Sequence, residues 1–231
     1  LPPLFGLQLP EVLLGLSIAA VAGTFLSLSR KDVTARRKTI FLMLTLAATL
    51  PLVIAMVKRP ALYNGIRHFI FVIPPMAVLA GAAFATAMNW LRDNGRAWQP
   101  AALAVFAFGL VLPPAEMIRL HPYQYTYFNH AAGTVRHADN LYMLDYWGLA
   151  FKQASEGLRA HLDATGQKPP AGRRWVVEIC GPQRGAEVAL GKDFETTWER
   201  KTADFALMLG TYYCRDDIPA PVLVEIRRKG V

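Results

Sequence analysis

The chain has 231 residues, of which 53% are hydrophobic and 18% are charged, and its formal net charge at pH 7 is +8. This composition argues against a wholly soluble protein and is typical of one that is partly embedded in a membrane. The cations do not form a patch interleaved with aromatic residues, so the positive charge does not indicate nucleic-acid binding. Because the chain begins at Leu1 and stops within a strand-like run, we interpret it as a piece of a longer protein.

Four apolar segments are long enough, or nearly so, to cross a bilayer as helices. They are Val12–Leu28, Thr39–Val57, Phe69–Trp90 and Ala101–Ile118. The stretch before them, Leu1–Pro10, is apolar and uncharged, and we expect it to lie along the membrane interface or to continue from a missing loop. Glycine and alanine recur in the first and third segments, which favours close packing between helices.

The loops between these segments carry unequal positive charge. Seven cations lie in the Arg30–Lys38 and Arg92–Arg96 loops, whereas three lie in the Lys58–Arg67 loop. Positively charged loops tend to stay in the cytoplasm. We therefore expect the Lys58–Arg67 loop, the N-terminus and everything after Arg119 to face outward.

Beyond residue 120 the composition changes to that of a small mixed domain. The segment His121–Asn129 is rich in tyrosine, which suits an exit from the membrane. Apolar residues at helical spacing predict an amphipathic helix from Leu149 to Leu162. Further along we expect a helix at Gln183–Leu190 and strands at Trp175–Cys180, Ala203–Leu209 and Val222–Ile226. The sequence thus predicts a transmembrane helix bundle over residues 1–120, followed over residues 121–231 by an extracytoplasmic α/β domain with some parallel strand pairing.

The two cysteines, Cys180 and Cys214, each fall at the close of a predicted strand. A disulfide between them is permitted if the domain lies outside the cytoplasm. Two unpaired structural thiols are the other interpretation. The sequence leaves both open.

The hexad Tyr63–His68 is the main candidate site, because it lies directly before the third apolar segment. Arg67 and His68 would then lie at the depth of lipid headgroups, where a cation can meet a phosphate, and the Tyr63 ring suits the same level. The alternative is a membrane anchor that binds nothing, since arginine and tyrosine flank many spans.

Asp145 is a secondary candidate, because it lies beside Tyr146 and Trp147 close to the predicted membrane face. Its alternative role is to cap the helix that follows. The five histidines do not have the spacing of metal ligands, and the sequence holds no phosphate-binding glycine loop and no Gly-x-Ser-x-Gly motif. We therefore predict neither a metal site nor a resident cofactor.

The order of several motifs resembles the C-terminal half of bacterial family 39 membrane glycosyltransferases, which are related to the dolichyl-phosphate-mannose protein mannosyltransferases and to the aminoarabinose transferases of lipid A. The motifs are Tyr63-Asn64-Gly65-Ile66-Arg67-His68-Phe69 with Pro74-Pro75, then Pro122-Tyr123-Gln124-Tyr125, Tyr127-Phe128-Asn129 and Leu144-Asp145-Tyr146-Trp147-Gly148. The resemblance covers most of the chain from Tyr63 onward. The first two apolar segments match in hydropathy alone.

This resemblance implies a multi-span GT-C fold in the bacterial inner membrane, with the C-terminal domain in the periplasm. It also implies a polyprenyl-phosphate sugar donor and transfer with inversion at the anomeric carbon on the outer face. Arg67 and His68, with Tyr63 and Asn64, are then the expected contacts of the lipid phosphate.

The chain departs from the family in one respect. The family's catalytic acid lies in the first outward loop, which no part of this chain matches, and Asn64 stands where some relatives carry an acid; an amide cannot act as a general base. We therefore name no catalytic residue. The alternative function is that of a non-catalytic transmembrane subunit of a larger membrane complex. The partners would then be other membrane subunits, whereas the enzyme would need its missing N-terminal half.

Overall fold

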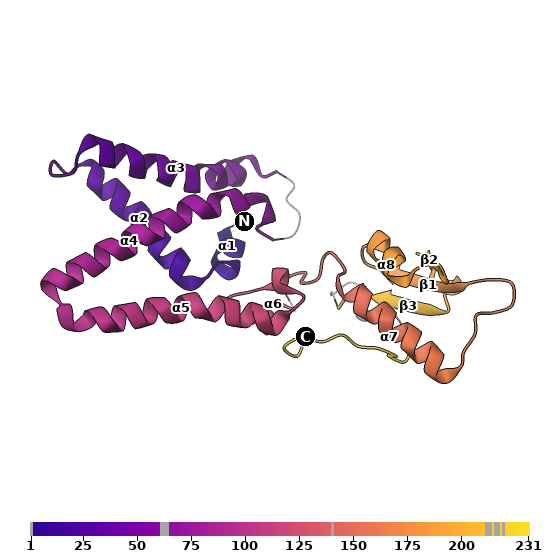
Figure 1. The fold of residues 1–231 in the computed structure, drawn as a ribbon. Helices are drawn as coiled ribbons and strands as arrows, with labels where there is room; N and C mark the ends of the chain where they lie inside the picture. The colour runs from indigo at the N-terminus through magenta and orange to yellow at the C-terminus, as the bar shows by residue number, and fades with distance from the viewer. Residues whose placement is uncertain (1, 61–64, 140, 211–213, 215–217, 219) are drawn as a thin grey trace. The chain divides into compact units, whose positions relative to one another are not determined.

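The computed structural model describes residues 2–60, 65–139, 141–210, 214, 218 and 220–231. The chain forms two compact units (Figure 1). The first comprises Leu1–Ile118 and Phe128–Ala132, and the second comprises Arg119–Tyr127 and Gly133–Val231. The chain therefore leaves the first unit after residue 118 and returns to it briefly before the second unit is completed.

The first unit is helical, and four of its helices are long and apolar enough to cross a membrane. They are α2 (Glu11–Leu28), α3 (Ala35–Lys58), the 3₁₀ turn η1 (Arg67–Val72) with α4 (Ile73–Asn94), and η2 (Arg96–Trp98) with α5 (Gln99–Leu120). They coincide with the four predicted segments and extend a few residues beyond them. The preceding apolar stretch contains a short helix, α1 (Pro2–Gln8).

The helices of the first unit meet through small and polar side chains. The Ser17 hydroxyl of α2 donates to the Met76 carbonyl oxygen of α4 at 3.1 Å, and Thr45 of α3 donates to Thr24 of α2 at 3.2 Å. Ser17, Thr24 and Thr45 are all buried. Small residues let helices approach closely, and hydroxyls that bond across helices need no water.

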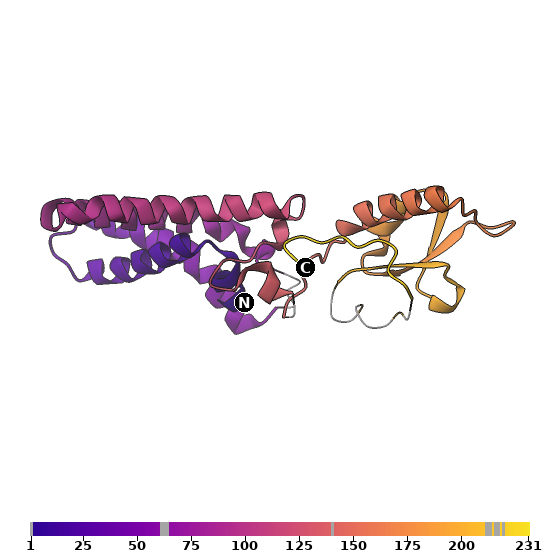
Figure 2. The same ribbon diagram turned by 90° about the horizontal axis from the view of Figure 1, so that it is seen from below.

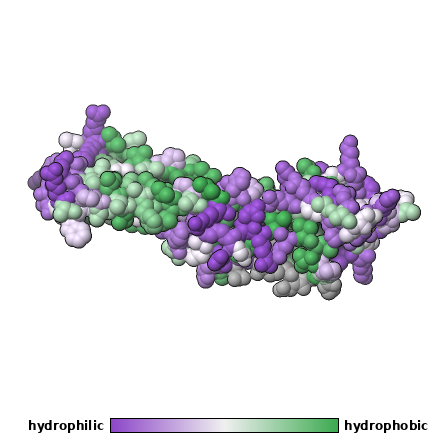
Figure 3. All heavy atoms as spheres, turned by 60° about the horizontal axis from the view of Figure 1, so that its bottom comes forward, coloured by the Kyte–Doolittle hydropathy of each residue, from purple (hydrophilic) through white to green (hydrophobic). Residues whose placement is uncertain are grey.

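Large apolar side chains lie on the outside of the same helices. Exposed examples occur on all four membrane-length helices and include Phe25, Leu26, Val57, Val78, Val105 and Val111. In Figure 3 hydrophobic residues (green) cover the middle of the bundle, and hydrophilic residues (purple) gather at the end of the bundle that lies at the left of the view. This arrangement is the reverse of a water-soluble bundle and is what a lipid environment favours.

The helix α5 lies along the bundle (Figures 1 and 2). Its backbone approaches α2 so closely that a Cβ atom at Gly109 would overlap the Val12 side chain. The rings of Phe84 on α4 and Phe106 on α5 stack with their centroids 3.8 Å apart. The first of these contacts places the middle of α5 against the start of α2.

The second unit contains a three-stranded parallel sheet in the order β2-β1-β3. Its elements are η3 (Gln124–Thr126), α6 (Thr134–Ala138), α7 (Ala150–Thr165), β1 (Trp175–Cys180), α8 (Gln183–Leu190), β2 (Phe194–Thr197), η4 (Arg200–Thr202) and β3 (Phe205–Met208). The register pairs Trp175 with Phe194 and Val177 with Phe205. Helices α7 and α8 share one core with the sheet, centred on Phe151, Val177 and Ile179.

Two details of the predicted strands were wrong. Residues 222–226 form no strand; the segment runs beside α7, where a Cβ atom at Gly157 would lie 2.6 Å from Val224. Val224 packs on this helix, whereas Val222 and Leu223 are exposed, so the apolar run reflects neither pairing in a sheet nor a buried core. The strand β2 was not predicted, because Phe194-Glu195-Thr196-Thr197 is too short and polar to stand out.

Candidate functional site

Arg67 is the first residue of η1, which has a kink at Phe69 and is followed directly by the apolar helix α4. Its side chain is half-buried, and its Nε lies 3.5 Å from Nε2 of the exposed His68. Pro74 and Pro75 occupy the first turn of α4, where proline fits the unpaired amides of a helix start. Tyr63 and Asn64 lie outside the described residues.

The backbone just before Arg67 is held by α1. The side-chain Oε1 of Gln8, the last residue of α1, accepts a hydrogen bond from the Ile66 amide at 3.1 Å. The Phe5 ring of α1 packs edge-on against the Phe69 ring, with centroids 6.1 Å apart, and both rings are buried. Two residues of a short helix thus fix both sides of Arg67.

Asn129 in turn holds the end of α1. Its side-chain Nδ2 donates to the carbonyl oxygens of Gly6 and Leu9 at 2.7 and 2.8 Å. Its backbone amide donates to the carbonyl oxygen of Leu7 at 2.8 Å. Its Oδ1 accepts from the Ala132 amide at 2.9 Å, and the residue is 0% exposed. Carbonyls at the end of a helix have no partner within it, so Asn129 supplies what α1 lacks.

Two carboxylates meet the same segment from two membrane-length helices. Glu11 Oε1, at the start of α2, accepts from the amides of His130 and Ala131 at 2.7 and 3.0 Å. Glu116 on α5 is only 6% exposed, and its Oε1 lies 3.6 Å from Nε2 of His130. An acidic residue that is buried on a membrane-length helix is a candidate for a function, and one of the groups beside Glu116 is an imidazole.

We call these residues the bundle-end cluster: Gln8, Glu11, Arg67, His68, Glu116, Asn129 and His130. Hydrogen bonds join Ile66, the neighbour of Arg67, to Gln8, and α1 to Asn129. The segment after Asn129 contacts both carboxylates. The cluster combines a guanidinium that can bind an anion with carboxylate and imidazole groups that can carry protons.

Sequence reasoning singled out Arg67 and His68 but missed the rest of the cluster. Glu116 had a visible signal, since it is the one acidic residue in an otherwise apolar segment. Asn129 belongs to the motif Tyr127-Phe128-Asn129, but the motif does not indicate its contacts with α1, and Gln8 had no signal in the sequence. The partners of Gln8 and Asn129 lie 58 and about 120 positions away along the chain.

In the second unit, Asp145 holds the start of α7. Its carboxylate accepts hydrogen bonds from the Tyr125 hydroxyl and from the amides of Leu149 and Ala150, the latter two at 2.9 and 2.8 Å. Burial and the adjacent Asp145 carboxylate raise the pKa of the Tyr125 phenol. This geometry matches the capping role, which was the alternative to a substrate contact.

The aromatic neighbours of Asp145 extend this contact network. The Tyr146 ring packs edge-on against the Tyr125 ring at a centroid distance of 5.2 Å, and the Trp147 ring lies 5.9 Å from that of Tyr146. Trp147 is more than half exposed.

Replacing Asp145 with alanine should lower the stability of the second unit by about 2–3 kcal/mol, because three donors lose their charged acceptor. Asp145→Asn should lose less, since the amide keeps one acceptor oxygen. Thermal unfolding measures both, with Asp163→Ala on the exposed side of α7 as the matched control. A loss of the protein's function at a temperature where the Asp145→Ala variant is fully folded would instead support Asp145 as a substrate contact.

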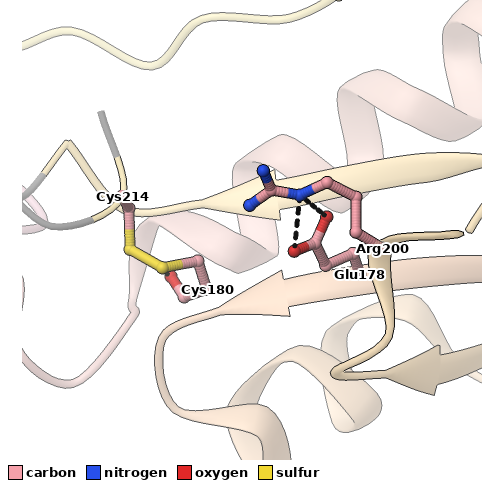
Figure 4. Close-up of a disulfide and its surroundings, with 4 residues drawn as sticks. All are labelled: Glu178, Cys180, Arg200 and Cys214. Carbon is pink, nitrogen blue, oxygen red and sulfur yellow. Dashed lines mark hydrogen bonds and ion pairs between the residues drawn. A yellow bond between two sulfur atoms is a disulfide. The ribbon is translucent and has the colours of Figure 1, made fainter. Parts of the chain in front are cut away.

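The two cysteines form a disulfide between Cys180, at the end of β1, and the buried Cys214 (Figure 4). On the same strand, the carboxylate of Glu178 is buried and pairs with Arg200, whose Nε lies 3.3 Å from both carboxylate oxygens. These two contacts tie η4 and Cys214 to the central strand.

Comparison of the chain with protein-family models, with curated proteins and with solved structures found no match. Within the described part of the chain, no three histidine, cysteine or acidic residues are grouped so that they could hold a metal ion.

Proposed function

We propose that this chain is the C-terminal part of an integral-membrane glycosyltransferase of the GT-C type, which moves a sugar from a polyprenyl-phosphate donor to an acceptor on the outer face of the bacterial inner membrane. The observation that carries the proposal is the position of Arg67, a half-buried guanidinium where a membrane-length apolar helix begins. The order of motifs from Tyr63 to Gly148 supports it.

A polyprenyl phosphate keeps its chain in the hydrocarbon and its phosphate among the headgroups. A cation at the end of a spanning helix lies at the same depth. A guanidinium can donate two parallel hydrogen bonds to phosphate oxygens. As the sugar departs, the phosphate gains negative charge, so the same contact becomes stronger in the transition state. We therefore assign Arg67 to the donor phosphate. His68, whose ring lies beside the Arg67 guanidinium, is assigned to a hydrogen bond with that group or with the interface.

Transfer also needs a base that takes the proton of the acceptor hydroxyl. In the family that the chain resembles, the base is the carboxylate of an acidic residue in the first outward loop. No segment of this sequence corresponds to that loop. The chain's own contribution is therefore to bind the donor and to stabilise the leaving phosphate.

The proposal requires the bundle-end cluster and the second unit to lie outside the cytoplasm. Ala97→Cys and Lys168→Cys, both at exposed positions, should therefore react with an impermeant thiol reagent from opposite sides of the membrane. The native cysteines can remain, because a disulfide does not react. Labelling of Lys168→Cys only after permeabilisation would overturn the orientation and the donor assignment with it.

Sugar transfer by the full-length protein tests the function itself. In proteoliposomes that contain a polyprenyl phosphate with a radiolabelled sugar and a membrane extract as the source of acceptor, we expect label to leave the donor lipid. The competing function is that of a non-catalytic structural subunit of a larger membrane complex. An intact donor, together with recovery of the protein in a fixed ratio with other subunits, would establish that alternative.

A further inference from the structure

We propose that Gln8 is a positioning residue for Arg67, and that Asn129 anchors the helix from which Gln8 acts. The inference rests on the proposed function, because it concerns how the donor-phosphate contact is held. It adds to that function two residues from distant parts of the chain that neither composition nor motif order assigns to the site.

The first step is the contact between Gln8 and the backbone. Ile66 directly precedes η1, and its carbonyl oxygen accepts from the Phe69 amide at 2.8 Å, which closes the first turn. Its amide has no partner within a turn that begins there. Gln8 Oε1 accepts this amide at 3.1 Å. Gln8 therefore fixes the Gly65–Ile66 peptide, one residue before Arg67, and through it the direction in which the guanidinium leaves the backbone.

The second step is that α1 cannot hold itself in place. A helix of seven residues is far below the length at which helices are stable alone. Its position comes from the packing of Phe5 and Leu9 in the core shared with Phe69, and from the three hydrogen bonds that Asn129 donates to its last carbonyls. Asn129 is the anchor, and α1 transmits its position to Ile66.

Gln8 affects the position of Arg67 but not the stability of the fold. Gln8 is half-buried, and its contact ends on a single backbone amide near the surface, whereas the core around Phe5 and Phe69 does not depend on it. Loss of the Gln8 acceptor should therefore leave the fold intact but free the peptide before Arg67. Small misplacements of a positioning group can lower a rate by about a hundredfold.

The test compares two variants of the full-length enzyme. Gln8→Met keeps the length of the side chain but removes the acceptor, and Gln8→Glu keeps an acceptor oxygen. We expect kcat for sugar transfer to fall about ten- to a hundredfold in Gln8→Met, with KM for the acceptor and the melting temperature unchanged. Gln8→Glu should retain most of the rate. Hydrogen exchange of the peptide that contains residues 65–72 should be faster in Gln8→Met alone.

Gln99→Met is the matched control. The side chain of Gln99 also bonds to the backbone of another helix, here as a donor to the Met88 carbonyl oxygen at 3.0 Å, but it lies at the other end of α5 from Glu116. Its replacement should not change the rate.

Three outcomes would overturn the inference. The first is a wild-type rate in Gln8→Met while Arg67→Ala is inactive, which leaves the proposed function standing. The second is a Gln8→Glu variant as slow as Gln8→Met, which would show that the acceptor is not what matters. The third is a wild-type protein without transfer activity, which would remove the proposed function and the inference together.

Discussion

Replacing Arg67 with alanine should lower the rate of sugar transfer by the full-length enzyme about a hundredfold or more, while the protein still inserts and folds. Arg67 is half-buried at the start of η1, and the neighbouring Ile66 and Phe69 are held by Gln8 and Phe5. Removing one charge-assisted donor from a developing charge commonly costs a few kcal/mol. The measurement is turnover of a synthetic polyprenyl-phosphate sugar, with expression and melting temperature recorded for each variant.

Arg67→Lys distinguishes a phosphate contact from a membrane anchor. A lysine keeps the charge at the interface but cannot bind two oxygens in one plane, so it should retain only a minor part of the rate. Lys58→Ala is the matched control, because Lys58 is an exposed cation in the last turn of α3, before the same loop. Full activity of Arg67→Ala would return the residue to the anchor interpretation.

Replacing Cys180 and Cys214 together with alanine should lower the melting temperature of the second unit by about 15 °C. The disulfide joins residues 34 positions apart, and closing a loop of that size stabilises a domain by about 3–4 kcal/mol in the chain-entropy model. In a domain of roughly 100 residues, each kcal/mol corresponds to a shift of about 4–8 °C. Differential scanning calorimetry of the double variant gives the shift directly.

Reduction of the wild-type protein provides the internal control for this prediction. A reductant should bring the wild type to the melting temperature of the double variant and leave the variant itself unchanged. If the variant melts within one or two degrees of the oxidised wild type, the disulfide is not a major source of stability in this unit.

Much of the helical architecture was predictable, because length and hydropathy decide whether a helix can cross a membrane. The four membrane-length helices α2, α3, α4 and α5 fall where the apolar segments predicted them. The element α8 agrees with its prediction for a different reason, since Pro182 and Gly191 bound a short amphipathic run.

The sheet was harder to predict, because strand pairing depends on distant parts of the chain. The strand β1 was predicted from its apolar run, which is interrupted by Glu178 alone and is typical of a central parallel strand. Residues 222–226 show the same kind of apolar run but lie beside α7, and the shorter β2 gives almost no signal of its own. A local pattern tells which side of a segment is buried and not what covers it.

The candidate site was predictable in part. Arg67 and His68 could be singled out, because a cation directly before an apolar helix has a defined depth in a membrane. Gln8 and Asn129 could not, since their importance lies in contacts made across most of the chain. The part of the site that binds could be read from the residues, whereas the part that positions required the fold.

A structure of the intact protein with a bound polyprenyl phosphate would test the central claim most directly. The account predicts phosphate oxygens within about 2.7–3.2 Å of the Arg67 guanidinium, the distance of a charge-assisted hydrogen bond. It also predicts that the Gln8 contact to the Ile66 amide is kept in the bound state. A phosphate bound elsewhere in the protein, with Arg67 facing bulk lipid, would contradict the account.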